Sequence, residues 1–284
     1  MERAIDLSND AETTRRVPGG ARAEIVLGGA RPRAPISRLE VHLAADRPDR
    51  LDVDLVVTSR DEASLFAALS TPPGVAIRAR IGGRPVFSGT TDGWSLRRDA
   101  FSGSSIRVLA HAAYQSSRAK SAARRYYQVT SSDVAEAIAR ELELLAVVER
   151  TRTVHARCEC AGDPLRFLRE LACEEEFELA VVDGTLYFVN ELPVAKERMT
   201  ATAGDLISLQ LDRPCSRRAD GVMEVRGDPR WRPLVPFGVA PAFASPALDG
   251  RLVAWRCVHR LSRDGYVTGI EFRRGLGERT GGAP

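Results

Sequence analysis

The sequence has no long uninterrupted hydrophobic run and none of the common catalytic or nucleotide-binding signatures. Its 284 residues contain nothing close to the roughly 20 consecutive apolar residues that a membrane-spanning helix needs. The Walker A motif, the dinucleotide-binding glycine pattern, His-Glu-x-x-His and Gly-x-Ser-x-Gly are all missing. We therefore expect no membrane span, no enzymatic activity, no catalytic residue, no cofactor and no small-molecule substrate.

Neither sign of charge is in excess, and cysteine is scarce. The 41 Lys and Arg residues nearly balance the 38 Asp and Glu residues, giving a formal net charge of +3. This balance argues against nucleic acid or an anionic membrane as the main partner. Five cysteines, an odd and scattered set, predict reduced thiols and not a disulfide framework. Residues 1–10 lack the apolar segment of a signal peptide, so we expect folding in the cytoplasm.

The best metal or nucleophile candidates are a short Cys-Glu-Cys segment and a run of glutamates. Cys158 and Cys160 would point to one face of a strand, close to His155. Structural zinc prefers two to four intervening residues and a second ligand pair, so we interpret both cysteines as buried thiols and predict no metal site. No histidine is marked as the partner of a nucleophilic cysteine. Residues 174–176 are all glutamate at a predicted helix end, which is typical of a solvated face.

Alternation with a period of two dominates residues 21–113. Leu51, Val53, Leu55 and Val57 alternate with more polar positions, and Val75–Ile81 behaves in the same way. Such alternation predicts strands with one buried and one wet face, which places Asp52 and Asp54 in water. A short helix is expected at residues 61–69. Several short strands at about ten-residue spacing favour a small barrel or sandwich.

The middle of the chain changes to a helical pattern. Thr130 and Asp133 have the spacing of a capping box at the start of an amphipathic helix. A second helix is predicted to begin with Asp163 as N-cap and Pro164 at its first position. Asp183-Gly184 then predicts a type I′ turn in a hairpin over residues 177–189.

Strand patterns return after residue 193 and continue to about residue 272. The proline-rich segment 228–245 is either an irregular loop or a partner-binding segment. Trp94, Trp231 and Trp255 are each as compatible with core packing as with an interface. The order of the elements is therefore β, then αβ, then β, a mainly β member of the α+β class.

The densest basic stretch is Arg118–Tyr127, with Arg118, Lys120, Arg124 and Arg125 followed by two tyrosines. Arginine binds phosphates and aromatic rings stack on bases, so a nucleic-acid-binding module is an alternative hypothesis for this protein. We favour a solvated or interface-forming connector, because the charge of the whole chain is nearly balanced.

Three motifs follow one another in the middle of the chain: the capped helix segment Tyr127–Leu144, the Asp-Pro-Leu-Arg-Phe-Leu helix Asp163–Ala172, and the Asp-Gly-Thr-Leu-Tyr-Phe element Asp183–Phe188. In this order they resemble the phage late control protein D family, the hub family of contractile tail baseplates. Strands near Pro85–Gly89 and the closing hairpin Val258–Thr268 are also similar to that family. The resemblance spans about residues 50–274, and the family's usual Gly-Tyr is replaced by Ile81-Gly82-Gly83.

The resemblance implies two small tube-type antiparallel β-barrels flanking an inserted α/β domain. We expect a flexible arm at residues 1–19, a first barrel at 20–117, the insert at 118–195, a second barrel at 196–275 and a flexible tail at 276–284. The implied function is that of a structural hub, a homotrimer that adapts a hexameric tail tube to a trimeric spike. The same resemblance extends to the hub portion of valine-glycine-repeat spike proteins.

The resemblance also implies the partners. They are two further copies of the chain, a tail tube protein and a spike, with baseplate wedge proteins as additional neighbours. The sequence after residue 275 holds no spike repeat, so we expect the spike to be a separate protein. Cytoplasmic assembly followed by incorporation into a virion tail or a phage tail-like particle is the expected localisation.

Overall fold

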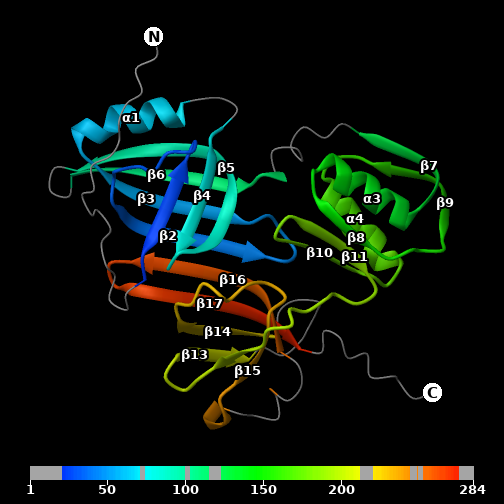
Figure 1. The fold of residues 1–284 in the computed structure, drawn as a ribbon. Coiled ribbons are helices and arrows are strands. Elements are labelled where there is room, and N and C mark those ends of the chain that lie inside the picture. Colours follow the sequence, from blue (N-terminus) through cyan, green and yellow to red (C-terminus); the bar gives the residue numbers. More distant parts are fainter. Residues whose placement is uncertain are drawn as a thin grey trace.

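The computed structural model describes residues 21–70, 74–99, 103–114, 123–211, 220–243, 248 and 252–274. Strands make up most of this part of the chain, with helices on the outside of the first β region and inside the middle region (Figure 1). The expected α+β fold, rich in antiparallel strands, is confirmed. The predicted arm and tail lie outside the described residues, as does the predicted boundary at residues 117 and 118.

The first β region consists of six strands and one helix. Its elements are β1 (Ala23–Leu27), β2 (Ile36–Ala44), β3 (Arg50–Val57), α1 (Ser59–Leu69), β4 (Ala76–Ile81), β5 (Arg84–Asp99) and β6 (Gly103–Ala112). The predicted alternation is confirmed in β3, where every second side chain is buried. Helix α1 covers one end of this region, and its Phe66 packs on Trp94 with ring centroids 4.7 Å apart.

The second β region follows the insert. Its elements are β12 (Met199–Ala201), β13 (Leu206–Leu211), β14 (Gly221–Arg226), β15 (Pro236–Val239), the 3₁₀ turn η1 (Pro241–Phe243), β16 (Leu252–Ser262) and β17 (Gly265–Arg274). The proline-rich segment is not a plain loop, because it contains β15 and the buried side chains Trp231 and Phe237. These two rings pack edge-on at 5.3 Å.

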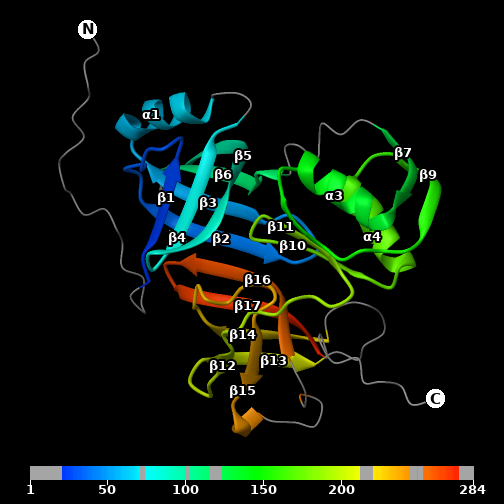
Figure 2. The ribbon, with the colours of Figure 1, turned by 45° about the vertical axis from the view of Figure 1, so that its right-hand side comes forward.

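The two β regions are joined into one sheet, which the sequence did not predict. Strand β2 pairs antiparallel with β16, from Leu39 opposite Leu261 to Ala44 opposite Arg256. The main path through the sheet is β1-β4-β5-β6-β3-β2-β16-β17-β14-β13, with β15 and β12 attached beside β16. No pairing among the described strands closes either half into a ring. Figure 2 shows β2 of the first half beside β16 of the second. One apolar core runs through both halves, so they are continuous in packing as well as in hydrogen bonding.

The insert forms a separate layer beside the sheet and has its own core. Its elements are β7 (Arg124–Thr130), α3 (Ser131–Glu141), β8 (Leu145–Val148), β9 (Val154–Cys160), α4 (Pro164–Glu174), β10 (Glu178–Val182) and β11 (Thr185–Val189). Strands β10, β11 and β8 form one small sheet, and β7 pairs with β9. The two helices pack their apolar faces together over the small sheet (Figure 1).

The local start signals of the insert are all confirmed. Thr130 and Asp133 form a reciprocal capping box at the start of α3. The Asp163 side chain accepts a hydrogen bond from the Leu165 N–H, and Pro164 opens α4. Asp183 and Gly184 have φ values of 49° and 76°, as a type I′ turn requires.

A small apolar cluster fixes the insert on the sheet. Trp255 of β16 and Ala45 from the end of β2 pack against Ala180 and Val189 of the insert hairpin. A backbone hydrogen bond of 2.9 Å from Val181 N–H to the Ala45 carbonyl crosses the same contact. Arg273 lies 3.5 Å over the Trp255 ring as a cation–π partner. The insert is therefore held by buried surface as well as by its chain connections.

Gly227 is required where the chain leaves β14. A Cβ atom at this position would lie 2.0 Å from the Tyr266 ring. The ring cannot move freely, because its hydroxyl lies 2.9 Å from Nδ1 of the buried His259. The backbone of Gly227 is also fixed, since its N–H donates to the Tyr266 carbonyl at 2.8 Å.

We predict that Gly227→Ala destabilises the protein by about 1–3 kcal/mol, the usual cost of overpacking a fitted site. Urea unfolding followed by circular dichroism measures the change. Gly204→Ala is the matched control, because the nearest atom to its Cβ would lie at 3.9 Å. Equal stability of the two variants would contradict the assigned role of Gly227.

Candidate functional site

Arg232 connects all three parts of the molecule. It lies in the segment between β14 and β15, and its Nη1 donates to Asp183 Oδ1 in the insert hairpin turn at 2.6 Å. Its Nη2 donates to the Pro85 carbonyl at the start of β5. A single guanidinium therefore holds the first β region, the insert and the second β region together. The planar guanidinium suits this task, since it can donate in several fixed directions.

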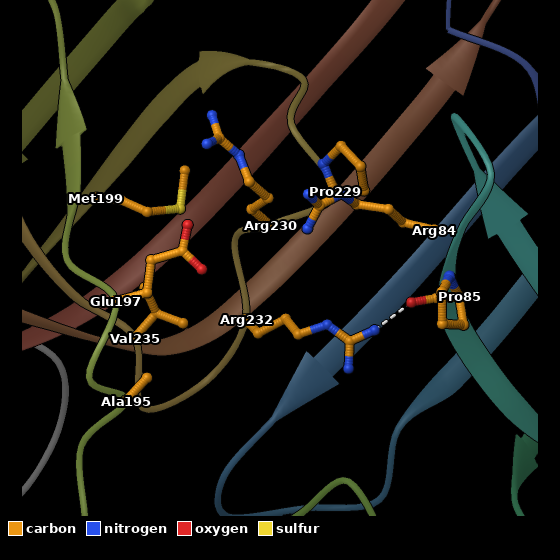
Figure 3. Close-up of a pocket in the computed structure, with 9 residues that line it drawn as sticks. All are labelled: Arg84, Pro85, Ala195, Glu197, Met199, Pro229, Arg230, Arg232 and Val235. Atoms are coloured by element: carbon orange, nitrogen blue, oxygen red, sulfur yellow. Dashed lines mark hydrogen bonds between the residues drawn. The ribbon is translucent and has the colours of Figure 1, made fainter.

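A pocket opens beside this junction, with a volume of about 350 Å³. Figure 3 shows Arg84 and Pro85 on one side, Glu197 and Met199 on the other, and Arg232 between them. The remaining lining residues are Ala195, Pro229, Arg230 and Val235. Three arginines and one glutamate line the pocket together with five apolar residues.

The polar side of the main sheet, here called the wet face, carries a ladder of paired charges. Arg107 Nε lies 2.9 Å from Asp52 Oδ1, between β6 and β3. Arg260 Nη1 lies 3.0 Å from Glu224 Oε1, between β16 and β14. Glu40 takes contacts from both Arg38 and His42 on β2 itself. Each exposed pair contributes little stability, and the pairs place opposite charges side by side along the wet face.

The acids of the ladder respond differently to their surroundings. Partial burial and the neighbouring charge of Asp52 raise the pKa of Asp54. Burial also acts to raise the pKa of Glu40, but hydrogen bonds and charges from Arg38 and His42 outweigh it and lower that pKa. Asp52 and Asp54 lie on the face of β3 opposite the core, as the alternation predicted. The prediction that this face places them in water is wrong for Asp52, whose side chain is only 16% exposed.

The cysteines lie where a structural role predicts them. Cys158 and Cys160 are buried on the same side of β9, and burial raises the pKa of both thiols. Cys257 is buried in β16, Cys173 is exposed, and Cys215 lies outside the described residues. In the described part of the chain, no three His, Cys, Asp or Glu side chains are grouped to hold a metal ion. None of its helices has the length and apolar character needed to cross a membrane.

The prediction that residues 174–176 form a solvated face is wrong for Glu175. Its side chain is only 13% exposed and accepts a 2.8 Å hydrogen bond from the Ser131 hydroxyl. The Ser131 oxygen also lies 2.8 Å from His155 Nε2. A serine nucleophile needs the acid on the far nitrogen of the histidine, whereas here the acid binds the serine itself. The cluster therefore fastens the start of α3 to the end of α4.

The basic stretch forms part of an ordered strand, so the predicted connector is wrong from Arg124 onward. Arg124 and Arg125 lie in β7, and Arg118 and Lys120 lie outside the described residues. Arg124 is ion-paired with Glu141, and Arg125 Nε lies 2.7 Å from Glu159 Oε1. These contacts reduce the charge that β7 can offer to a phosphate backbone.

The sequence interpretation did not identify the junction and its pocket. Arg230 and Arg232 were visible within the proline-rich segment, but nothing in the pattern paired Arg232 with Asp183 and Pro85, which lie 49 and 147 positions away in the chain. The Asp-Pro-Arg-Trp-Arg run at residues 228–232 was the available clue. It alternates arginines with a tryptophan that the structure buries, so the arginines have to face the other way.

The fold is shared with several tail proteins of known structure. The 43 kDa tail protein of prophage MuSo2 from Shewanella oneidensis matches at 12% identity and TM-score 0.65, over 89% of this chain and 96% of that one. A tail protein from Neisseria meningitidis MC58 matches at 11% identity and TM-score 0.64, over 90% and 97% of the two chains.

A third match comes from a secretion system. The E. coli c3393 protein is a type VI secretion component described as similar to the T4 phage tail proteins gp27 and gp5. It matches at 11% identity and TM-score 0.66, over 88% of this chain and 76% of that one. No family model and no curated protein matches the sequence. The protein therefore shares the fold of these proteins, in agreement with the motif resemblance, and the likeness is one of structure.

We predict that Arg232→Met loosens both turns that Arg232 contacts. The loss of hydrogen bonds from a partly exposed charged donor costs about 1–2 kcal/mol. Amide hydrogen exchange should therefore accelerate in the turns at residues 82–85 and 183–184. Arg263→Met is the control, because Arg263 lies in an exposed turn. Unchanged exchange in both turns would refute the connecting role.

His259 makes stability depend on pH. Burial lowers its pKa to about 4, and its Nε2 lies 3.0 Å from the Trp231 carbonyl. The unfolded chain binds a proton near pH 6.5 while the folded chain does not. The contribution of His259 is therefore complete above pH 6.5 and is lost as the pH falls toward 4. The shift corresponds to about 3 kcal/mol.

The stability difference between the wild type and His259→Gln should shrink by that amount between pH 7.5 and pH 4, as measured by urea unfolding. The wild type has to be compared with the variant at each pH, because the titration of Asp49 changes the stability of both in the opposite direction. Burial raises the pKa of Asp49 to about 7, so its protonation favours the folded state as the pH falls. A constant difference across this range would show that His259 does not carry the effect.

Proposed function

We propose that the protein is the structural hub of a contractile phage tail or a tail-like injection system. In this proposal three copies form a ring that adapts a hexameric tail tube to a trimeric spike made by a separate protein. The observation that carries the proposal is the single sheet built from both β regions through the β2–β16 pairing. Each chain then offers two fused β units, and three chains offer six.

Strand β13 supplies the edge through which such a ring would grow. It is the last strand of the sheet path, and its Ile207 and Leu211 are 55% and 39% exposed. Val222 on the neighbouring β14 is also exposed. An open, apolar edge strand is a site for pairing with another chain unless it is covered. A ring of identical subunits would cover this edge in every copy.

The wet face suits the wall of a central channel. Its carboxylates and guanidiniums are largely engaged with each other along β2, β3, β6, β14 and β16. A wall of paired charges attracts passing protein or DNA less strongly than a wall of one sign. We therefore assign the wet face to the lumen.

The remaining parts of the proposal concern partners and place of action. The hub contacts a tail tube protein on one side and the spike on the other, with wedge proteins around it. It assembles in the cytoplasm, becomes part of the particle, and acts by geometry without catalysis. The alternative of nucleic-acid binding gains no support from Arg124 and Arg125, since both are ion-paired.

Light scattering after size exclusion tests the ring directly. Three chains of 31.0 kDa give about 93 kDa, and we expect this mass for the wild type at several concentrations. The double variant Ile207→Lys/Leu211→Lys should shift the mass to that of one chain, because burying two ammonium groups at the edge is costly.

The double variant Leu145→Lys/Val154→Lys is the matched control. These positions are 72% and 59% exposed but lie on the insert, so the trimer should persist. A wild type that stays monomeric even when mixed with candidate tube and spike proteins would refute the hub. A trimer that tolerates both lysines on β13 would place the subunit interface elsewhere.

A further inference from the structure

The pocket beside Arg232 has the composition of a peptide-binding site. It lies where the start of β5, the chain entering β12 and the segment before β15 meet. Met199, Val235, Pro85 and Pro229 provide apolar walls, and three arginines provide donors. A volume of about 350 Å³ accommodates a side chain together with its flanking backbone.

The three arginines differ in whether their side-chain N–H donors already have hydrogen-bond acceptors. Arg230 is held by Asp228, with Nε 2.9 Å from Oδ2 and Nη2 at 2.6 Å. Arg232 is bound to Asp183 and Pro85. Arg84 extends along the pocket toward Pro229 (Figure 3) and makes no hydrogen bond or ion pair with a described residue. The charge of Arg84 does reach the Asp228 carboxylate, where it helps to lower the pKa of Asp228. Arg84 is nevertheless the arginine whose side-chain N–H donors have no partner among the described residues, beside two guanidiniums that are already fixed in place.

Glu197 limits which anions can enter. It lines the wall opposite Arg84 and makes no close ion pair with a described residue, although its charge contributes to raising the pKa of Arg230. A doubly charged phosphate would bring excess negative charge close to this carboxylate. A single carboxylate can bind the arginine side as a bidentate partner and leave room for neutral peptide groups near Glu197.

We propose that this pocket binds an aspartate or glutamate side chain presented by an extended segment of a partner protein. The carboxylate would pair with Arg84, and the residues on either side of it would pack on Met199 and Val235. This inference uses only the pocket and does not depend on the hub proposal, because any protein partner with an accessible acidic segment could use the site.

The probe is N-acetylglutamate methylamide, a single carboxylate between two peptide groups, titrated into the full-length protein and followed by NMR. Its neutral counterpart, N-acetylglutamine methylamide, should bind about tenfold more weakly, because a charge-assisted hydrogen bond is lost. Arg84→Gln should weaken the acidic probe by about the same factor. Arg80→Gln, an exposed position on β4 outside the pocket, should leave the affinity unchanged.

Glu197→Gln provides a test that misfolding cannot imitate. Removing the like charge should tighten the acidic probe several-fold, the opposite direction from Arg84→Gln. Equal affinity for the acidic and neutral probes would overturn the proposal, as would an acidic-probe affinity that is insensitive to both variants. Inorganic phosphate binding more tightly than the acidic probe, with the same dependence on Arg84, would also overturn it by showing a simple anion site.

Discussion

The antiparallel pairing of β2 with β16 is the constraint on which the rest of the molecule depends. It converts two β regions separated by the whole insert into one sheet with one apolar core. Residues at the end of this pairing also build the seat of the insert, since Ala45 follows β2 and Trp255 belongs to β16. Arg256 adds an ion pair to Asp46 at the same place, with Nε 2.9 Å from Oδ1. If this pairing were lost, the core, the position of the insert and the wet face would be lost with it.

Two kinds of interaction hold the parts of the molecule together around this pairing. Buried apolar contact supplies most of the free energy that holds the insert, because Trp255 and its neighbours are removed from water. Directional polar groups then fix the orientation. Arg232 does this for the two turns and His259 for the segment that carries Trp231. Apolar contacts therefore stabilise the junction, and the charged or buried polar groups set its orientation.

Features determined by short-range chemistry could be predicted from the sequence. The caps at Thr130 and Asp163 and the Asp183-Gly184 turn depend on residues within a few positions of each other, so one sequence is enough to identify them. The alternation in β3 also depends only on which face is buried.

The joining of β2 to β16, the contacts of Arg232 and the burial of Glu175 depend on residues that meet only after folding. Strand β7 was missed because its arginines pair with glutamates on other elements. The pocket could not be predicted for the same reason, since its lining comes from three separate segments.

The long separation between β2 and β16 has a consequence for biosynthesis. Asp46 and Arg256, which meet at this pairing, are 210 positions apart in the chain. A ribosome therefore completes β2 and most of the insert well before it releases the strand that covers the β2 edge. During that interval the nascent chain carries an unpaired edge above a half-formed apolar core, which is the state in which β-rich chains aggregate or pair wrongly. Non-local pairing of this kind also slows folding. The pairing that gives the folded protein its continuous sheet therefore leaves the nascent chain exposed to aggregation and wrong pairing until its last strands have been synthesised.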